Sequence, residues 1–126
     1  MNLSNVKLVV TDMDGTLLNS NGKVSNTFYK LYNKLIKKDV HFVAASGRQY
    51  HNMVQKLNPI KQDITFIAEN GAIAKYRDQE IVITELSLDK VDMLVSLLKG
   101  LPNVYPVICG NKMLIQKIMK IVLLIF

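Results

Sequence analysis

Residues 8–16 read Leu-Val-Val-Thr-Asp-Met-Asp-Gly-Thr, a short apolar run that ends in two carboxylates and a glycine. The run Leu8–Val10 is continuously apolar and rich in valine, which favours a strand buried on both faces, as in a parallel sheet. The polar cluster Asp12–Thr16 follows it directly. Ligands of open α/β sheets bind beyond the carboxyl ends of the strands, so this junction is a candidate site.

Two later segments repeat the arrangement of a strand followed by a polar cluster. The strand predicted at residues 40–45 runs into Ser46-Gly47-Arg48, and the one at residues 64–68 runs into Glu69-Asn70-Gly71. Helical patterns lie between the strands. The alternation of strands and helices predicts a doubly wound α/β domain, in which all three polar clusters meet at one edge of the sheet.

The other expected elements follow from turn, cap and periodicity signals. They are a flap at residues 17–22 with an Asn-Gly turn, a helix that begins at Ser25 or Asn26, a helix at 49–57, a hairpin of 72–76 and 80–84 around 77–79, a helix capped by Ser87, and a strand at 104–108.

Asp12 and Asp14 are two residues apart, so their side chains can point to one side of the strand end. One carboxylate could attack phosphorus and the other could exchange protons with the leaving oxygen and with water. Oxygen ligands of this kind suit Mg²⁺. An ordinary Asp-Gly turn is the commoner explanation of such a pair, whereas a calcium loop is excluded because Leu17 and Lys23 occupy its glycine and glutamate positions.

The other two clusters also allow two interpretations each. The Ser46 hydroxyl can donate to a phosphate oxygen at a helix N-terminus, or it can simply cap that helix. Arg48 can steer an anionic substrate or pair with a nearby carboxylate. Asn70 and Gly71 can contact substrate or form a routine turn.

The three clusters, taken in order and with their spacing, resemble a known set of motifs. They are Asp12-Met13-Asp14-Gly15-Thr16, Ala45-Ser46-Gly47-Arg48 and Glu69-Asn70-Gly71-Ala72. In this combination the chain resembles the haloacid dehalogenase superfamily of phosphohydrolases, in particular its Cof-type sugar-phosphatase branch. The resemblance implies an α/β, Rossmann-like core over residues 1–84 and the start of an α/β cap over residues 85–111.

The resemblance also implies a role for each motif residue. Asp12 is the nucleophile that forms an aspartyl-phosphate, and its carboxylate binds Mg²⁺. Asp14 is the general acid and base and offers its backbone carbonyl to the metal, while Ser46 holds the phosphoryl group. The substrate would be a small phosphorylated metabolite, most simply a sugar phosphate. Its contacts are assigned to Gly15, Thr16, Gly47, Arg48, Asn70 and Gly71.

The chain departs from the family pattern after the expected start of the cap. Members usually return to the core with a lysine and a Gly-Asp-x-x-Asn-Asp segment, and neither occurs here. No Asp or Glu follows Asp92. We therefore expect a truncated, incomplete core with weakened metal binding and phosphate-charge neutralisation. An inert fragment and a phosphate-binding module are the alternatives to an active phosphatase.

Residues 112–126 differ in composition from the rest. Eleven of the fourteen residues from Met113 to Phe126 are apolar, and the only charges are lysines. A buried strand or helix is one interpretation, and a membrane-surface helix is a less favoured one. A reading-frame shift near Lys112 is another, because AT-rich codons read one base earlier encode a polar segment that resembles the family's continuation. Sequencing the gene would decide between them.

Composition and charge restrict the possible partners. The 126 residues, 49% hydrophobic, fit one domain or a domain plus part of another, and a single cysteine excludes a disulfide framework. The net charge is +6, but half of it belongs to the last fifteen residues, so no nucleic-acid surface is predicted. With no signal peptide pattern and no apolar run near the roughly 20 residues of a membrane span, we expect a cytoplasmic protein. The oligomeric state is not indicated.

Overall fold

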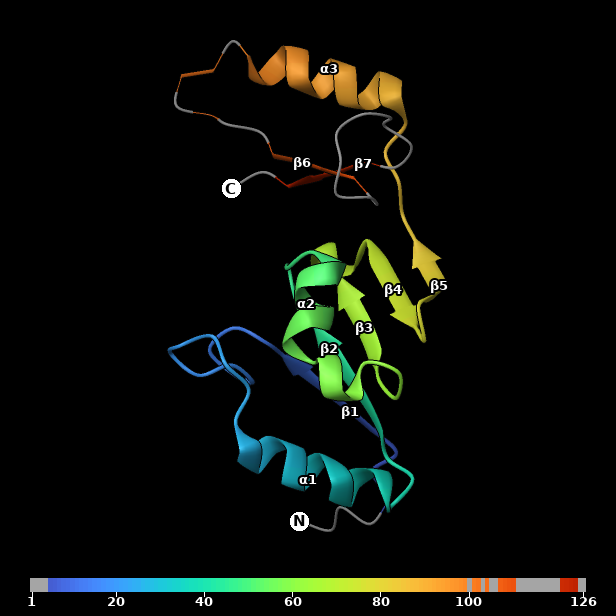
Figure 1. Ribbon diagram of the computed structural model, residues 1–126. Coiled ribbons are helices and arrows are strands. Elements are labelled where there is room, and N and C mark those ends of the chain that lie inside the picture. Colours follow the sequence, from blue (N-terminus) through green and yellow to red (C-terminus); the bar gives the residue numbers. More distant parts are fainter. Residues whose placement is uncertain (1–4, 100, 103, 105–106, 111–120, 125–126) are drawn as a thin grey trace. The chain divides into compact units, whose positions relative to one another are not determined.

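The computed structural model describes residues 5–99, 101, 102, 104, 107–110 and 121–124 (Figure 1). The chain divides into two compact units, Met1–Ile83 and Thr84–Phe126. The first unit contains all three polar clusters, so it is the unit that matters for the site.

The first unit is built on a five-stranded sheet with the order β1-β2-β3-β4-β5. The first three strands, β1 (Leu8–Asp12), β2 (His41–Ala45) and β3 (Thr65–Ala68), are parallel. The last two, β4 (Ile73–Tyr76) and β5 (Gln79–Ile83), continue the sheet as an antiparallel hairpin. The α/β architecture with a parallel sheet is therefore as predicted.

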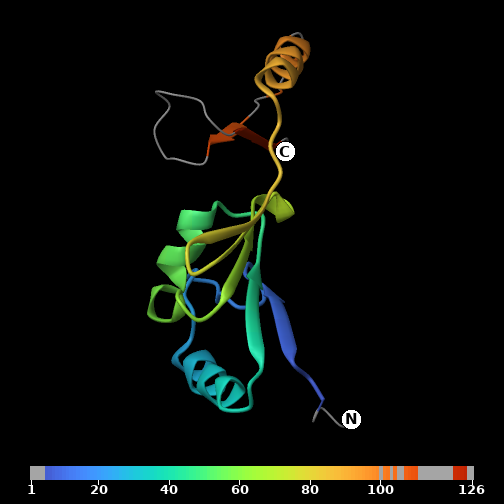
Figure 2. The same ribbon diagram turned by 90° about the vertical axis from the view of Figure 1, so that its right-hand side faces the viewer.

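Two helices connect the parallel strands. Helix α1 (Asn26–Ile36) begins after Ser25, whose hydroxyl accepts a hydrogen bond from the Phe28 N–H at 3.1 Å, and α2 (Tyr50–Lys56) follows β2. A 3-10 turn (η1, Asn58–Ile60) ends the second connection. Figure 2 shows α1 and α2 on the same side of the sheet.

The core of the unit lies between these helices and the sheet. Its buried members come from the strands, both helices and the loops that flank them. They are Met13, Leu18, Tyr32, Phe42, Ala44, Met53, Leu57, Ile60, Ile64, Phe66, Ala68 and Ile73.

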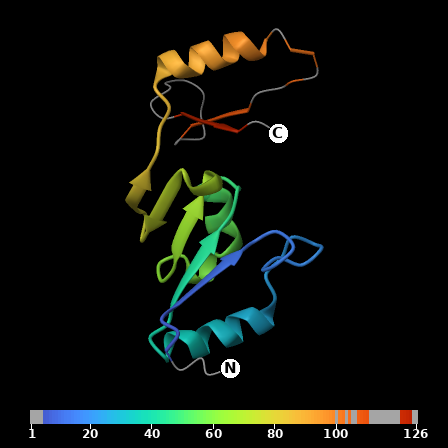
Figure 3. The same cartoon turned by 180° about the vertical axis from the view of Figure 1, so that it is seen from behind.

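The prediction that β1 is buried on both faces is wrong. Leu8 and Val10 are each 54% exposed, whereas Val9 packs against the core. Since β1 ends the described sheet and the helices cover one face, its other face has no covering layer among the described residues of this unit. The view from behind shows β1, β2 and β3 in front of α2 (Figure 3).

The hairpin of β4 and β5 turns more tightly than expected. The predicted turn covered residues 77–79, but Gln79 already belongs to β5, so only two residues connect the strands. Arg77 and Asp78 both have positive φ, 51° and 60°. That pair of left-handed residues is typical of a two-residue type I′ turn, whose twist matches the strands.

The second unit contains helix α3 (Leu88–Leu98) and two antiparallel strands, β6 (Val107–Gly110) and β7 (Ile121–Leu124). The strand predicted at residues 104–108 is thus found later in the chain. Part of the apolar tail is a strand, and the rest of it, residues 112–120 and 125–126, lies outside the described residues. In the described part of the chain, no helix has the length and apolarity needed to cross a membrane.

Candidate active site

The three polar clusters meet at one edge of the sheet because β1, β2 and β3 are parallel. Asp12 pairs in register with Ala45, the residue before Ser46. The Ser46 N–H donates to the carbonyl of Ile67 in β3 at 2.9 Å. The predicted convergence of the clusters is therefore present in the structure.

The loop after β1 is organised around the buried residue Met13. Its carbonyl accepts hydrogen bonds from the N–H groups of Thr16, Leu17 and Leu18, at 3.4, 3.1 and 2.8 Å. Gly15 has φ +73°, and nothing lies within 4 Å of a Cβ built there, so its backbone conformation rather than space favours glycine. The hydrogen bond from the Thr16 N–H is part of this turn, in which Asp14, Gly15 and Thr16 are exposed.

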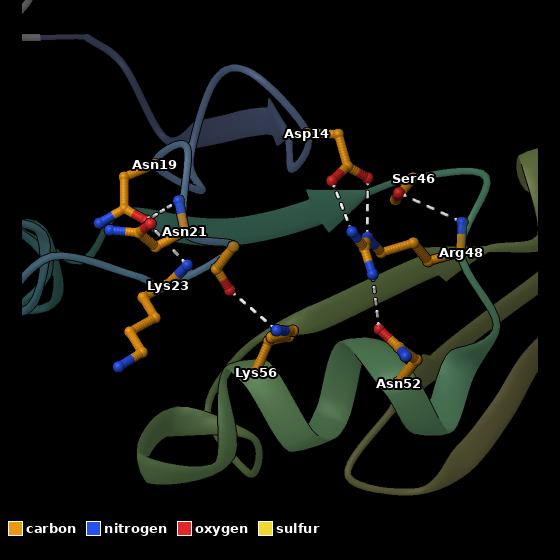
Figure 4. A network of polar contacts seen from close by, with 9 residues as sticks. Asp14, Asn19, Asn21, Lys23, Ser46, Arg48, Asn52 and Lys56 are labelled. Atoms are coloured by element: carbon orange, nitrogen blue, oxygen red, sulfur yellow. Dashed lines mark hydrogen bonds and ion pairs between the residues drawn. The ribbon is translucent and has the colours of Figure 1, made fainter.

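The Arg48 guanidinium donates two hydrogen bonds to the carboxylate of Asp14. Its Nε donates to Oδ2 and its Nη2 to Oδ1, each at 2.7 Å (Figure 4). The remaining nitrogen, Nη1, donates to Asn52 Oδ1 at 2.9 Å. This fork geometry fixes both charged groups. Two roles were predicted for Arg48, steering of an anionic substrate and pairing with a carboxylate. The structure contains the second, an ion pair with Asp14.

The ion pair changes the ionisation of Asp14. Hydrogen bonding to the Arg48 guanidinium holds the pKa of Asp14 below its ordinary value, against a smaller opposing effect of burial. In this arrangement Asp14 is an acceptor that is difficult to protonate. Protonation of Asp14 becomes easier once Arg48 releases one of its oxygens.

Ser46 is not the cap of a helix, contrary to one of the predictions. Helix α2 begins at Tyr50, after Gln49, so Ser46 precedes it by a short turn. In that turn the Ser46 hydroxyl oxygen accepts from the Arg48 N–H at 3.2 Å. Since a hydroxyl can accept and donate at once, its hydrogen is able to donate to an anion.

Gly47 lies directly against the side chain of Asn70. A Cβ at Gly47 would lie 2.7 Å from Asn70 Oδ1, closer than real Cβ contacts. Asn70 itself is exposed and has φ +54°, and Gly71 follows with φ +93°. The second and third polar clusters are therefore in contact where the Asn70 side chain lies against Gly47.

Two further residues at the site were missed by the sequence analysis. Asn52 holds Arg48, and Lys56 Nζ donates to the Gly22 carbonyl at 2.8 Å, which fastens the flap loop (Figure 4). Lys56 is also near enough to lower the pKa of Asp14. The signal that could have found them is the four-residue spacing of positions 48, 52 and 56.

The donors for a Mg²⁺ ion in the described part of the chain are few. No group of three Asp, Glu, His or Cys side chains there could hold a metal ion, and the Asp14 carboxylate is paired with Arg48. Asp12 is exposed at the end of β1. Mg²⁺ commonly keeps several waters and binds one or two carboxylates plus substrate phosphate. Asp12 and the Asp14 carbonyl are the groups that could hold a largely hydrated ion here.

We predict that Arg48→Met raises the pKa of Asp14 toward its ordinary value, because the guanidinium that stabilises the carboxylate is removed. The check is a carboxyl-carbon NMR titration of the metal-free chain, with the exposed Lys38→Met as the control that leaves Asp14 unchanged. Asp14 is more than half exposed, so the pair adds little stability. That small contribution is present above the unfolded-state pKa and is lost as pH falls through the folded-state pKa. An unchanged titration in Arg48→Met would contradict the pairing.

A family model described as haloacid dehalogenase-like hydrolase matches residues 9–122. The chain belongs to this family. Its similarity to the 5-amino-6-(5-phospho-D-ribitylamino)uracil phosphatase YbjI of Escherichia coli (strain K12) is 34% identity over 108 residues, 84% of this chain and 40% of that protein. The family expected from the three motifs is confirmed.

Solved structures of the family agree with the fold. SMU.1108c from Streptococcus mutans UA159 superposes with a TM-score of 0.81 at 28% identity, over 86% of this chain and 41% of that one. The HAD subclass IIB sugar phosphatase BT4131 shares the fold with a TM-score of 0.63 at 19% identity, over 86% and 42% of the two chains. The chain thus spans about two fifths of the length of these relatives.

Proposed function

We propose that the chain hydrolyses small phosphate monoesters with Mg²⁺, through a phosphoryl group carried on Asp12. The observation that carries the proposal is the meeting of Asp12, Asp14, Ser46 and Arg48 at one edge of the parallel sheet. A carboxylate nucleophile, a second carboxylate, a hydroxyl and a guanidinium are the groups that phosphoryl transfer needs. Family membership supports the same reaction class.

In the first step, a carboxylate oxygen of Asp12 attacks phosphorus and the bond to the ester oxygen breaks. Asp14, once it has a proton, gives it to the leaving oxygen. In the second step, Asp14 takes a proton from water, whose oxygen attacks the phosphorus and releases phosphate and the free Asp12 carboxylate. Asp12 and the Asp14 carbonyl would hold Mg²⁺, which offsets the negative charge of carboxylates and phosphate.

Ser46 and Arg48 would hold the phosphoryl group in place. The Ser46 hydroxyl already accepts from the Arg48 N–H, so its hydrogen can donate to a phosphoryl oxygen. Arg48 can exchange the Asp14 carboxylate for a phosphate, because its fork of donors suits both anions. That exchange would free Asp14 for proton transfer at the moment when substrate binds.

The substrate class proposed is a phosphorylated sugar or polyol. The support is the similarity to a phosphoribitylamino-uracil phosphatase and the shared fold of a sugar phosphatase. We also propose that residues 1–84 are the N-terminal part of the core and that residues 85–111 begin the cap domain. The second unit then contributes to substrate selection in the whole protein.

The unchanged 126-residue chain, assayed with p-nitrophenyl phosphate, should release phosphate with Mg²⁺ and stop after chelation by EDTA. A rise in melting temperature with phosphate but no turnover would instead support a phosphate-binding module. Neither turnover nor stabilisation would support the inert alternative.

A further inference from the structure

Glu69 is the buried charged residue among the described side chains, with 6% of its surface exposed. One of its carboxylate oxygens, Oε2, is buried without a hydrogen-bond partner. Burial raises the pKa of Glu69. A carboxyl group in this position is costly for folding, and an apolar side chain of similar size would avoid that cost.

The backbone at Glu69 is strained as well. Glu69 and Asn70 have φ of 53° and 54°, and Gly71 has φ 93°, so three consecutive residues of the 3-10 turn η2 (Glu69–Gly71) are left-handed. Glycine adopts this region freely and asparagine tolerates it, but a glutamate there is strained. Such strain persists only where the surroundings hold it in place.

Glu69 and its neighbour are joined to the Ser46–Tyr50 segment at four points. The Glu69 N–H donates to the Arg48 carbonyl at 3.0 Å, and the Asn70 N–H to the Ser46 carbonyl at 3.4 Å. The backbone of Tyr50, the first residue of α2, is close enough to the Glu69 carboxylate to lower its pKa. The fourth point is the contact of the Asn70 side chain with Gly47.

These contacts place Glu69 behind the residues that would hold phosphate. Its backbone sets the carbonyl of Arg48, and its carboxylate sets the start of the helix that bears Asn52, the second partner of the Arg48 guanidinium. Glu69 therefore acts on the Arg48 backbone directly and on the Arg48 guanidinium through α2 and Asn52. Among the described residues, His51 is the titratable group that acts on this carboxyl, and it lowers the pKa of Glu69.

We infer that Glu69 is a positioning residue that orients Arg48 and Asn70 for the phosphoryl group, without touching that group itself. The inference rests on the proposed function and adds to it a residue that the catalytic roles do not include. The strained turn and the buried carboxyl are then the means by which the second and third clusters are held in one geometry.

The test compares three variants of the full chain. Glu69→Ala removes the carboxylate beside the Tyr50 backbone, Glu69→Gln keeps an oxygen of the same reach, and Ile60→Ala removes buried volume in η1. Each is measured for its melting temperature, for the affinity of orthovanadate with Mg²⁺, and for the NMR resonance of Arg48 Nε–H, which reports the pairing with Asp14.

Glu69→Ala should weaken vanadate binding about tenfold, the effect of losing roughly one hydrogen bond to a charged group, and should shift the Arg48 Nε–H resonance. Glu69→Gln should stay within about threefold of the unchanged chain. Ile60→Ala should lower the melting temperature and leave affinity and resonance unchanged. If Glu69→Ala behaves like Ile60→Ala in all three measurements, the positioning role is wrong.

The resonance separates this inference from the proposed function. A chain that neither binds vanadate nor hydrolyses esters contradicts the proposed function, yet its Arg48 Nε–H still reports whether Glu69 orients the guanidinium. An unshifted resonance in Glu69→Ala contradicts the positioning of Arg48 whatever the activity.

Discussion

Asp12→Asn should lower the rate of phosphate-ester hydrolysis about a thousandfold or more, the scale of losing a nucleophile. The amide has neither the negative charge nor the nucleophilic oxygen of the carboxylate, and it is also a poorer ligand for Mg²⁺. Asp12 is exposed at the end of β1, and Asn has nearly the same shape. The fold should therefore tolerate the change. The measurement is phosphate release from p-nitrophenyl phosphate with saturating Mg²⁺.

The control for this prediction is Asp39→Asn. Asp39 is fully exposed and lies 4.0 Å from Lys7 in an ion pair, and its φ of 56° is one that asparagine tolerates. The substitution removes the same charge with little effect on stability or hydrolysis. If both variants lose activity equally, or if Asp12→Asn retains it, Asp12 is not the nucleophile. The Arg48–Asp14 pair should survive in Asp12→Asn, which the Arg48 Nε–H resonance can check.

The meeting of the three clusters could be predicted from the sequence because it depends on few assumptions. Short apolar runs that end in polar residues predict parallel strands, and the carboxyl ends of parallel strands share an edge. Asp12, Ser46 and Glu69 follow from that rule alone. The rule uses only local patterns, which are the part of folding that a single sequence displays.

The contacts within the site could not be predicted in the same way. Arg48 pairs with Asp14, which lies 34 positions away in the chain. The sequence contains several other carboxylates and does not indicate which of them Arg48 pairs with. Ser46 looked like a helix cap, but α2 begins only at Tyr50 because the intervening turn is held by Glu69 and Asn70. Such choices depend on packing between distant segments, and no local pattern records them.

The same limit explains the errors in the fold. A continuous apolar run is expected both in a central strand and in one that ends the described sheet, so the exposure of Leu8 and Val10 could not be predicted from β1 itself. The strand expected at residues 104–108 is found as β6 at Val107–Gly110 because its bounds are set by pairing with β7. The tail that supplies β7 has an apolar pattern that fits helix and strand equally.

Phe66→Ala should destabilise the first unit by about 3–5 kcal/mol, the usual cost of removing a buried phenylalanine. Phe66 is 1% exposed in β3, between β2 and β4, and its ring meets that of Tyr50 edge-on at 5.6 Å. The truncation leaves a cavity and removes a ring contact between α2 and the sheet. Urea unfolding followed by circular dichroism measures the change, with Ile81→Ala as the control.

Ile81 is 60% exposed in β5, so its truncation should change the free energy of unfolding by no more than about 0.5 kcal/mol. Equal effects of the two variants would show that the sheet and α2 do not form the core described. A loss of about 3–5 kcal/mol is a large share of the roughly 5–15 kcal/mol that stabilises a typical domain. Because β3 leads directly into Glu69 and α2 carries Asn52 and Lys56, Phe66→Ala should also loosen the site, and Arg48 Nε–H should exchange faster while the chain is still folded.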